Sequence, residues 1–185
     1  LEAADFKKSG LSAEEFFERA IAEQPLVRNR IGDGRRVSQV YTAADFSYRS
    51  EKLTGDRWLL AGDAAGFIDP VFSSGVFLAV LAGEQAADVL HEVLDHPKRA
   101  RRLFRHYERL VNRAMDVYLR FVESWYAGKE FIEVFLTPTD LLQIPPAVNA
   151  VLGGNVSNRF AIRWRMELFY LIVRLQRKWT LCPRL

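Results

Sequence analysis

The stretch of sequence that decides the fold is LLAGDAAGFIDPVFSSGVFLAVLAGEQAADVL, residues 59–90. A short apolar run ends in Gly62-Asp63, a turn of small residues follows, and Ser74 precedes a helix-like pattern. We expect the apolar run, residues 57–62, to be a buried parallel strand. Asp63 would then lie at the carboxyl end of that strand, where open α/β sheets bind ligands.

The residue types in this stretch suit a ligand with hydroxyl groups and a nearby negative charge. Ionised Asp63 only accepts hydrogen bonds, so its natural partners are hydroxyl and amide groups rather than phosphate. Ala64, Ala65 and Gly66 leave room for a ligand to approach the backbone. The helix that opens at Ser74 presents free N–H groups and the positive end of its dipole to an anion.

Both aspartates of this stretch also have a structural interpretation. Asp63 in Gly-Asp-Ala-Ala is alternatively a turn residue that caps its own backbone. Asp69 precedes Pro70, and we predict that it shapes the turn, with a contact to a ligand as the alternative.

Composition bounds the class of protein. The 185 residues are 49% hydrophobic and 26% charged, which is typical of a soluble globular protein with one sizeable core. No apolar run is long enough to cross a bilayer. The single cysteine, Cys182, cannot form an internal disulfide, so we expect a reducing, cytoplasmic setting. The net charge of +3 is too small to indicate nucleic-acid binding.

Two kinds of catalytic site are disfavoured by the residue pattern. The three histidines lack metal-ligand spacing, so we expect no metal site. Ser73 and Ser74 lack the GxSxG pattern of a hydrolase nucleophile.

Hydrophobic periodicity predicts a chain that is mostly helical. Ser12 and Glu15 have the spacing of a capping box at the start of a helix that Pro25 ends. Residues 37–48 are rich in β-branched and aromatic residues and predict a strand. Further helices are expected over residues 76–94, 98–126, 129–138 and 158–179, and residues 141–154 are irregular or helical. The last helix should bury Phe160, Trp164, Leu168, Leu171, Ile172 and Leu175.

The string GDAAGFIDPVFSSGVFLA, residues 62–79, resembles the second flavin-binding motif of FAD-dependent monooxygenases of the p-hydroxybenzoate hydroxylase type. Within that superfamily, DPVFSSGV is most similar to the flavin-dependent halogenases of the phenol and pyrrole branch. Residues 118–136 and 163–177 resemble the helical C-terminal region of the same family.

The resemblance implies an α/β fold that is mostly helical in this chain, the C-terminal part of a p-hydroxybenzoate hydroxylase-like FAD-binding fold with a helical extension. Residues 1–56 would end the substrate-binding domain, residues 57–96 would complete the FAD-binding domain, and residues 97–185 would form the helical region. The partner that it implies is the N-terminal half of the same flavoprotein, because the GxGxxG fingerprint is absent here. The family's catalytic lysine is expected in that half, and no lysine of this chain has a matching context.

The resemblance also implies roles for single residues. Asp63 would bind the ribityl hydroxyls of FAD, and Pro70 would shape the turn beside the flavin ring. Ser74 and Gly75 would present N–H groups to a halide near the flavin pyrimidine edge. The implied cofactor-binding set is Gly62, Asp63, Ala64, Ala65, Gly66, Pro70, Gly75 and Val76.

One position departs from part of the family. Tryptophan-type halogenases have a glutamate two residues before the position that matches Ser74, and this chain has Phe72. This difference favours a more electron-rich substrate than indole.

The resulting hypothesis is an FAD-dependent halogenase. It would use reduced FAD from a separate flavin reductase, oxygen, and chloride or bromide to halogenate an electron-rich aromatic molecule, either free or on an acyl or peptidyl carrier protein. The alternatives are a flavin-dependent monooxygenase or reductase without halide use, and a non-catalytic helical interaction module. The basic run over residues 96–109 is either a solvated helix face or a docking surface for an acidic carrier protein.

Overall fold

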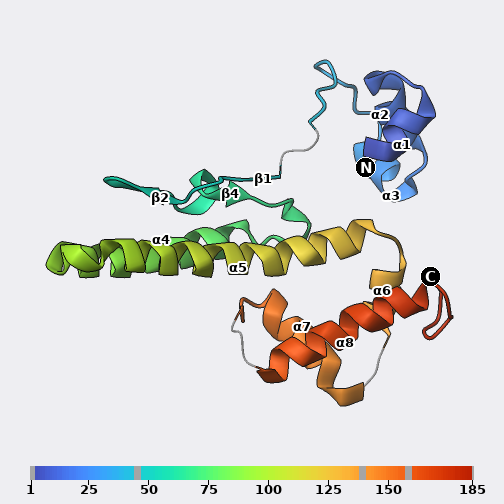
Figure 1. The fold of residues 1–185 in the computed structure, drawn as a ribbon. Coiled ribbons are helices and arrows are strands. Elements are labelled where there is room, and N and C mark those ends of the chain that lie inside the picture. The colour runs from blue at the N-terminus through green and yellow to red at the C-terminus, as the bar shows by residue number, and fades with distance from the viewer. Residues whose placement is uncertain (1–2, 44–46, 138–140, 157–159, 185) are drawn as a thin grey trace. The chain divides into compact units, whose positions relative to one another are not determined.

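The computed structural model describes residues 3–43, 47–137, 141–156 and 160–184 (Figure 1). The chain forms two compact units, Leu1–Phe46 and Ser47–Leu185. The expected domain boundaries at residues 56 and 96 stay predictions, since the two units are defined by compactness alone.

The N-terminal unit consists of the helices α1 (Ala3–Ser9), α2 (Ala13–Ala22) and α3 (Pro25–Ile31). The predicted capping box is confirmed, because the Glu15 N–H donates to Ser12 Oγ at 3.3 Å and the Ser12 N–H donates to Glu15 Oε2 at 2.8 Å. The Ser12 N–H and the Ser12 hydroxyl both donate to the Glu15 carboxylate, and these two hydrogen bonds hold the pKa of the Glu15 carboxyl below its usual value. Helix α2 ends at Ala22, and Pro25 begins the next helix instead of only closing this one.

The strand predicted over residues 37–48 is wrong for most of its length. Residues 37–43 form no strand, residues 44–46 lie outside the described part, and only Tyr48 belongs to one. Val37 and Tyr41 are 93% and 78% exposed. Their β propensity is not realised because no neighbouring strand within the described residues pairs with them.

The C-terminal unit contains two short antiparallel ladders. Strand β1 (Tyr48–Arg49) pairs with β4 (Gly66–Phe67), and β2 (Thr54–Gly55) pairs with β3 (Trp58–Leu59). The expectation of a buried parallel strand before Asp63 is therefore wrong. A tight hairpin joins β2 to β3 through Arg57, which has a left-handed φ of 61°, and Trp58 at its edge is 43% exposed.

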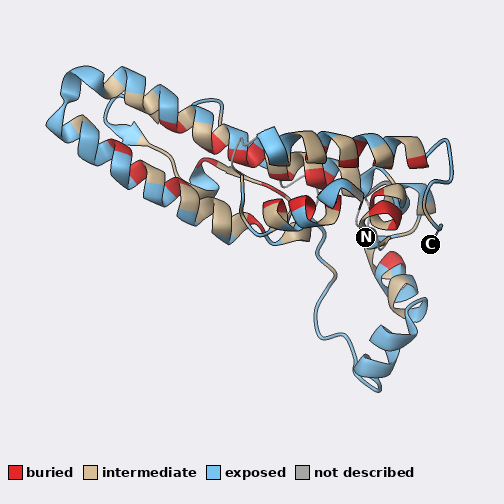
Figure 2. Ribbon diagram, turned by 90° about the horizontal axis from the view of Figure 1, so that it is seen from below, coloured by how far each residue is buried: buried red, intermediate tan, exposed pale blue. Residues whose placement is uncertain are grey.

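Helices α4 (Gly75–Asp95) and α5 (Ala100–Tyr126) run side by side and carry the first core (Figures 1 and 2). Helix α4 contributes the small buried residues Ala82 and Ala86, which allow the large buried Tyr107 and Tyr118 of α5 to approach closely. Both helices lie near their predicted ranges. The outer side of α4 remains apolar and exposed at Val76, Val80, Leu90 and Leu94.

The second core joins the C-terminal half of α5 to α6 (Glu130–Leu136), α7 (Ile144–Leu152) and α8 (Phe160–Gln176). Residues 144–152, left open as irregular or helical, are helical. The predicted apolar face of α8 is partly wrong, because Phe160 and Leu171 are 80% and 45% exposed, whereas Leu168 and Ile172 are partly buried against the second core. The buried face consists of Met166, Phe169, Tyr170, Val173 and Gln176.

The hydrogen bonds of the buried Gln176 side chain explain the position of the buried face of α8. The Gln176 amide donates to Glu133 Oε2 at 2.8 Å and to the Cys182 carbonyl at 2.9 Å. Its oxygen accepts from the N–H groups of Leu181 and Cys182, each at 2.8 Å. Gln176 is thus buried with its hydrogen bonds satisfied, and it ties the C-terminal segment to α6 and α8.

Because of the buried Tyr107 phenol, we expect the free energy of unfolding to decrease at alkaline pH. The phenol donates to the Leu60 carbonyl at 2.6 Å, and burial raises the pKa of Tyr107 to about 12. The unfolded chain therefore gives up this proton first, so the free energy of unfolding falls between pH 10 and pH 12, by about 1–2 kcal/mol for this group.

We expect Tyr107→Phe to unfold at a lower urea concentration at pH 8, by about 1 kcal/mol for the lost hydrogen bond, and to depend less steeply on pH above 10. Tyr41→Phe, at an exposed tyrosine, is the matched control. Equal alkaline slopes for the wild type and Tyr107→Phe would contradict the assignment.

Candidate functional site

The turn that follows β3 is held by its backbone oxygens. It contains the single helical turn η1 (Gly62–Ala64), and Gly62 has a φ of 56°, which favours glycine. Donors from residues far along the chain hold four of the carbonyl groups around it. The four hydrogen bonds are Tyr107 Oη to Leu60 O at 2.6 Å, Tyr48 Oη to Asp63 O at 2.5 Å, Ser50 Oγ to Ala64 O at 3.0 Å and Ser50 N to Ala65 O at 3.0 Å.

The side chain of Asp63 has no part in holding this turn. The residue is exposed, and its carboxylate accepts no hydrogen bond from any residue that the structure describes. The alternative in which Asp63 caps its own backbone is therefore wrong. An ionised carboxylate in this state can accept hydrogen bonds from a ligand without breaking an existing contact.

Asp69 shows the opposite behaviour, as predicted for a structural turn residue. Its Oδ1 accepts from the Val71 N–H at 3.0 Å, and its Oδ2 accepts from the Tyr126 hydroxyl at 3.1 Å. Its own N–H donates to Ser47 Oγ at 3.0 Å. Asp69 thus fixes the short helical turn η2 (Pro70–Phe72), in which Pro70 is exposed.

The small residues after Asp63 differ in their surroundings. Ala64 is exposed, whereas the side chain of Ala65 is buried in the first core. A Cβ on Gly66 would collide with Met115 and would lie 2.8 Å from the Tyr48 carbonyl oxygen. Packing within the chain thus accounts for Gly66.

Helix α4 begins beside this turn with an open first residue. Ser73 has a left-handed φ of 52°, and Ser74, only 4% exposed, precedes the helix without a side-chain cap. A Cβ on Gly75 would meet no atom within 4 Å, and Val76 is 78% exposed. The first N–H groups of a helix have no acceptor within it, so they are available to an anion.

The two predicted parts of the site lie on packed neighbours. Helix α4 packs against η1, and a Cβ on Gly62 would lie 3.4 Å from Ala79 Cβ. The structure therefore brings a hydrogen-bond-accepting carboxylate and a helix N-terminus together on adjoining elements.

Three supporting residues of this site were not predicted from the sequence. Tyr48, Ser50 and Tyr107 hold the turn from positions 14 to 47 residues away along the chain. No local pattern marks them, because their partners are backbone carbonyl groups that any residue provides.

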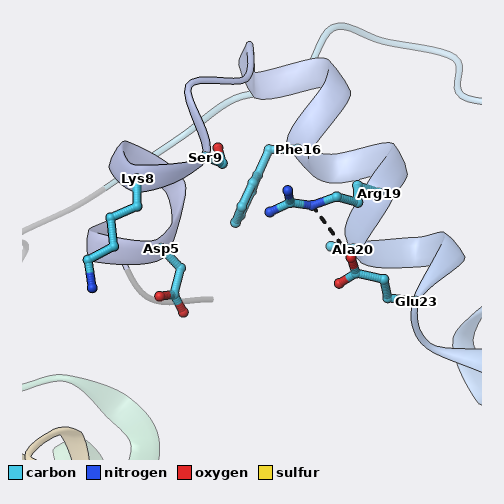
Figure 3. A pocket seen from close by; sticks show the side chains of 7 residues that line it. All are labelled: Asp5, Lys8, Ser9, Phe16, Arg19, Ala20 and Glu23. Atoms are coloured by element: carbon cyan, nitrogen blue, oxygen red, sulfur yellow. Dashed lines mark ion pairs between the residues drawn. The ribbon is translucent and has the colours of Figure 1, made fainter.

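Metal-ligand clusters, membrane-spanning helices and a further pocket are the remaining features of the described residues. The part of the chain that the structure describes contains no group of three His, Cys, Asp or Glu side chains placed to hold a metal ion, and none of its helices is both long and apolar enough to span a membrane. Figure 3 shows a pocket in the N-terminal unit, where Arg19 lies over the Phe16 ring and pairs with Glu23 at 3.6 Å. This pocket contains none of the predicted site residues.

Phe72 connects the motif to the helical region. Its ring lies 5.6 Å from the rings of Phe121 and Trp125 and 5.9 Å from that of Phe131, between ring centres. Position 72 therefore belongs to an aromatic cluster that borders both cores.

Comparisons with known proteins agree with the resemblance. Residues 13–139 match the family model described as tryptophan halogenase. The chain is 30% identical over 122 residues to the 1H-pyrrole-2-carbonyl-(peptidyl-carrier protein) chlorinase of Pseudomonas fluorescens, covering 66% of this chain and 27% of that protein. It is 44% identical over 71 residues to the corresponding brominase of Pseudoalteromonas luteoviolacea, covering 38% of this chain and 18% of that protein.

A solved structure supports the same assignment. The crystal structure of CmlS, a flavin-dependent halogenase, matches with a TM-score of 0.52 and 31% identity over 67% of this chain and 22% of that one. The expected fold class, a mostly helical part of a flavin-dependent halogenase fold, is confirmed. The chain spans about a quarter or less of the length of these proteins.

Because of the aromatic cluster, we expect a carboxylate at position 72 to lower the free energy of unfolding strongly. We expect Phe72→Glu to lower the free energy of unfolding by about 3–5 kcal/mol, because it removes a large ring and places a charge among apolar groups. Phe72→Leu, the matched control, should cost only about 1–2 kcal/mol. Urea unfolding at pH 7 measures both, and an equal loss for the two variants would contradict this account.

Proposed function

Because the chain belongs to the tryptophan halogenase family, we propose that it is part of an FAD-dependent halogenase, an oxidoreductase that uses oxygen and a halide. The observation that carries this proposal is the exposed Asp63 carboxylate beside the open start of α4. When bound, FAD supplies the activation of oxygen by which halide is oxidised. The residues of this chain contribute binding and positioning.

The described residues fit a flavin with its hydroxylated arm over the turn. Asp63 accepts hydrogen bonds from hydroxyl groups, and its carboxylate has no competing donor among the described residues. The exposed Ala64 lets a ligand approach the backbone on this side, and Gly62, which has a left-handed φ, lets η1 pack closely on α4. Gly66 and the side chain of Ala65 contribute by packing, and Pro70 shapes the turn that leads to α4.

The start of α4 fits a halide. Gly75 has no neighbour in the direction of a side chain, and the N–H groups of Gly75 and Val76 belong to the first turn of a helix of 21 residues. The positive end of that helix favours an anion, and the buried Ser74 reduces competition from water. We assign chloride or bromide binding to Ser74 and Gly75.

The substrate that we propose is an electron-rich aromatic group carried by a peptidyl or acyl carrier protein. Two relatives are named for halogenation of a pyrrole on a peptidyl carrier protein. Phe72 supports the same choice, since its place in the aromatic cluster leaves no carboxylate there to activate a less reactive ring. Reduced FAD would come from a separate flavin reductase, and cytoplasmic localisation remains part of the proposal.

The two aspartates provide a paired test of FAD binding. We expect Asp63→Ala to weaken FAD binding by the complete gene product by about 10- to 100-fold, the cost of losing hydrogen bonds to a charged group. Its free energy of unfolding should stay within about 0.5 kcal/mol of the wild type, because the Asp63 carboxylate has no hydrogen-bond partner among the described residues.

Asp69→Ala is the matched control and should show the reverse. It loses the hydrogen bonds to Val71 and Tyr126, so it should unfold about 1–2 kcal/mol more easily, and its folded form should lose far less FAD affinity than Asp63→Ala does. Flavin fluorescence titration and urea unfolding measure the two quantities. Wild-type FAD affinity in Asp63→Ala would overturn the assignment of the turn.

Halide dependence separates a halogenase from a monooxygenase or reductase. Reduced, FAD-loaded gene product is mixed with oxygenated buffer at constant ionic strength, with chloride, bromide or acetate, and flavin reoxidation is followed by stopped-flow absorbance. We expect a rate that changes saturably with chloride or bromide and not with acetate. Gly75→Val, which fills the open position, should raise the half-saturating halide concentration at least tenfold. A rate that is indifferent to halide would leave a flavoprotein that is not a halogenase.

A further inference from the structure

The short helical turn η3 (Pro97–Arg99) and the first half of α5 carry an unbalanced positive charge. Residues 98–115 contain seven Lys or Arg and one Glu, whereas the whole chain has a net charge of only +3. The single carboxylate, on Glu108, accepts hydrogen bonds from the N–H groups of Leu53 and Thr54 at 3.2 and 3.0 Å. None of the seven cations forms an ion pair with a described residue.

Three of the basic side chains on α5 border a groove with apolar walls. The groove has a volume of about 520 Å³ and lies between α4, α5 and the segment of residues 154–156. His106, Arg109 and Arg113 provide its basic edge. Leu81, Leu110 and Val156 provide apolar surface.

One wall of the groove adjoins the start of α4. Gly154 has a φ of 99°, and a Cβ on it would lie 2.7 Å from the Phe77 ring. Phe77 belongs to the first turn of α4, two residues after Gly75. Gly154, which lines the groove, therefore packs against the helix turn to which we assign the halide.

We infer that this groove is the docking surface for the carrier protein, an inference that rests on the proposed function. Arg109 and Arg113 would bind the phosphate of the phosphopantetheine arm, and the other cations of α5 would attract the acidic surface of the carrier. The apolar walls would hold the arm. Charge complementarity thus selects the partner, and the groove selects its prosthetic arm.

The shape of the surface favours a carrier protein over nucleic acid. The groove is lined by no Phe, Tyr or Trp side chain, the larger rings on which bases stack, and its one aromatic ring is the imidazole of His106. Its cations lie on one helix next to apolar surface, which suits one phosphate with an uncharged arm better than a continuous chain of phosphates.

The test uses the complete, FAD-loaded gene product and a dye-labelled peptidyl carrier protein, the one on which the Pseudomonas fluorescens relative acts. Binding is measured by fluorescence anisotropy for the carrier with and without its phosphopantetheine arm. The test variant is Arg109→Glu with Arg113→Glu. The control is Arg101→Glu with Arg105→Glu, which changes the charge equally on the same helix at residues that do not line the groove. Retention of FAD is measured for every variant.

We expect the armed carrier to bind the wild type at least tenfold more tightly than the carrier without its arm. Arg109→Glu with Arg113→Glu should weaken binding of the armed carrier at least tenfold and abolish that difference, while the control pair should change binding less than threefold. All variants should retain FAD.

Three results would overturn the docking surface while leaving the assignment as part of an FAD-dependent halogenase intact, because FAD is retained in each. These are a wild type that binds neither form of the carrier, an equal loss in both pairs of variants, and an arm that makes no difference. Tighter binding of a single-stranded oligonucleotide, lost in Arg109→Glu with Arg113→Glu, would assign the groove to nucleic acid instead. A wild type that never holds FAD would refute the proposed function itself.

Discussion

The site depends on one constraint, which is that the backbone oxygens of the turn between Leu60 and Ala65 must have donors. The Ala65 N–H donates to the Gly62 carbonyl within the turn, and the donors to the Leu60, Asp63, Ala64 and Ala65 carbonyls come from Tyr48 and Ser50 on one side and from Tyr107 of α5 on the other. Backbone polar groups without partners are costly, which makes these bonds structural requirements. Because these bonds hold the backbone, the Asp63 side chain, which accepts no hydrogen bond from a described residue, is available for binding.

The motif and the helical region are packed against each other as one unit. Tyr107 joins α5 to the turn before the motif, and Phe72 places the middle of the motif among rings from α5 and α6. The start of α4 follows directly and packs on η1. The position of the helix N-terminus relative to Asp63 is therefore set by packing on both sides of the motif, which is the preorganisation that a binding site for a cofactor and an anion needs.

Much of this architecture could be predicted from the sequence, where the determinants are local. The Ser12–Glu15 box and the apolar spacing of α4 and α5 depend on residues within a few turns of one another, and all three predictions are confirmed. Predictions failed where the deciding partner is distant. Val37 and Tyr41 favour a strand that no described neighbour completes, and the buried face of α8 follows from Gln176, whose partners are Glu133 and the segment around Cys182. Whether Asp63 caps its own turn or binds a ligand could not be predicted from the turn alone. The residues that hold the turn in its place, Tyr48, Ser50 and Tyr107, lie elsewhere in the chain.

The aromatic contacts of Phe72 also bear on how such proteins diverge. A partly buried residue that packs against three rings cannot change its chemistry independently of them, so a substitution at this position becomes tolerable only after changes at Phe121, Trp125 or Phe131. A change from one class of aromatic substrate to another would then require neutral substitutions in the helical region before position 72 of the motif could vary. Transferring the motif alone from one family member to another would transfer its sequence without the aromatic packing on which its conformation depends.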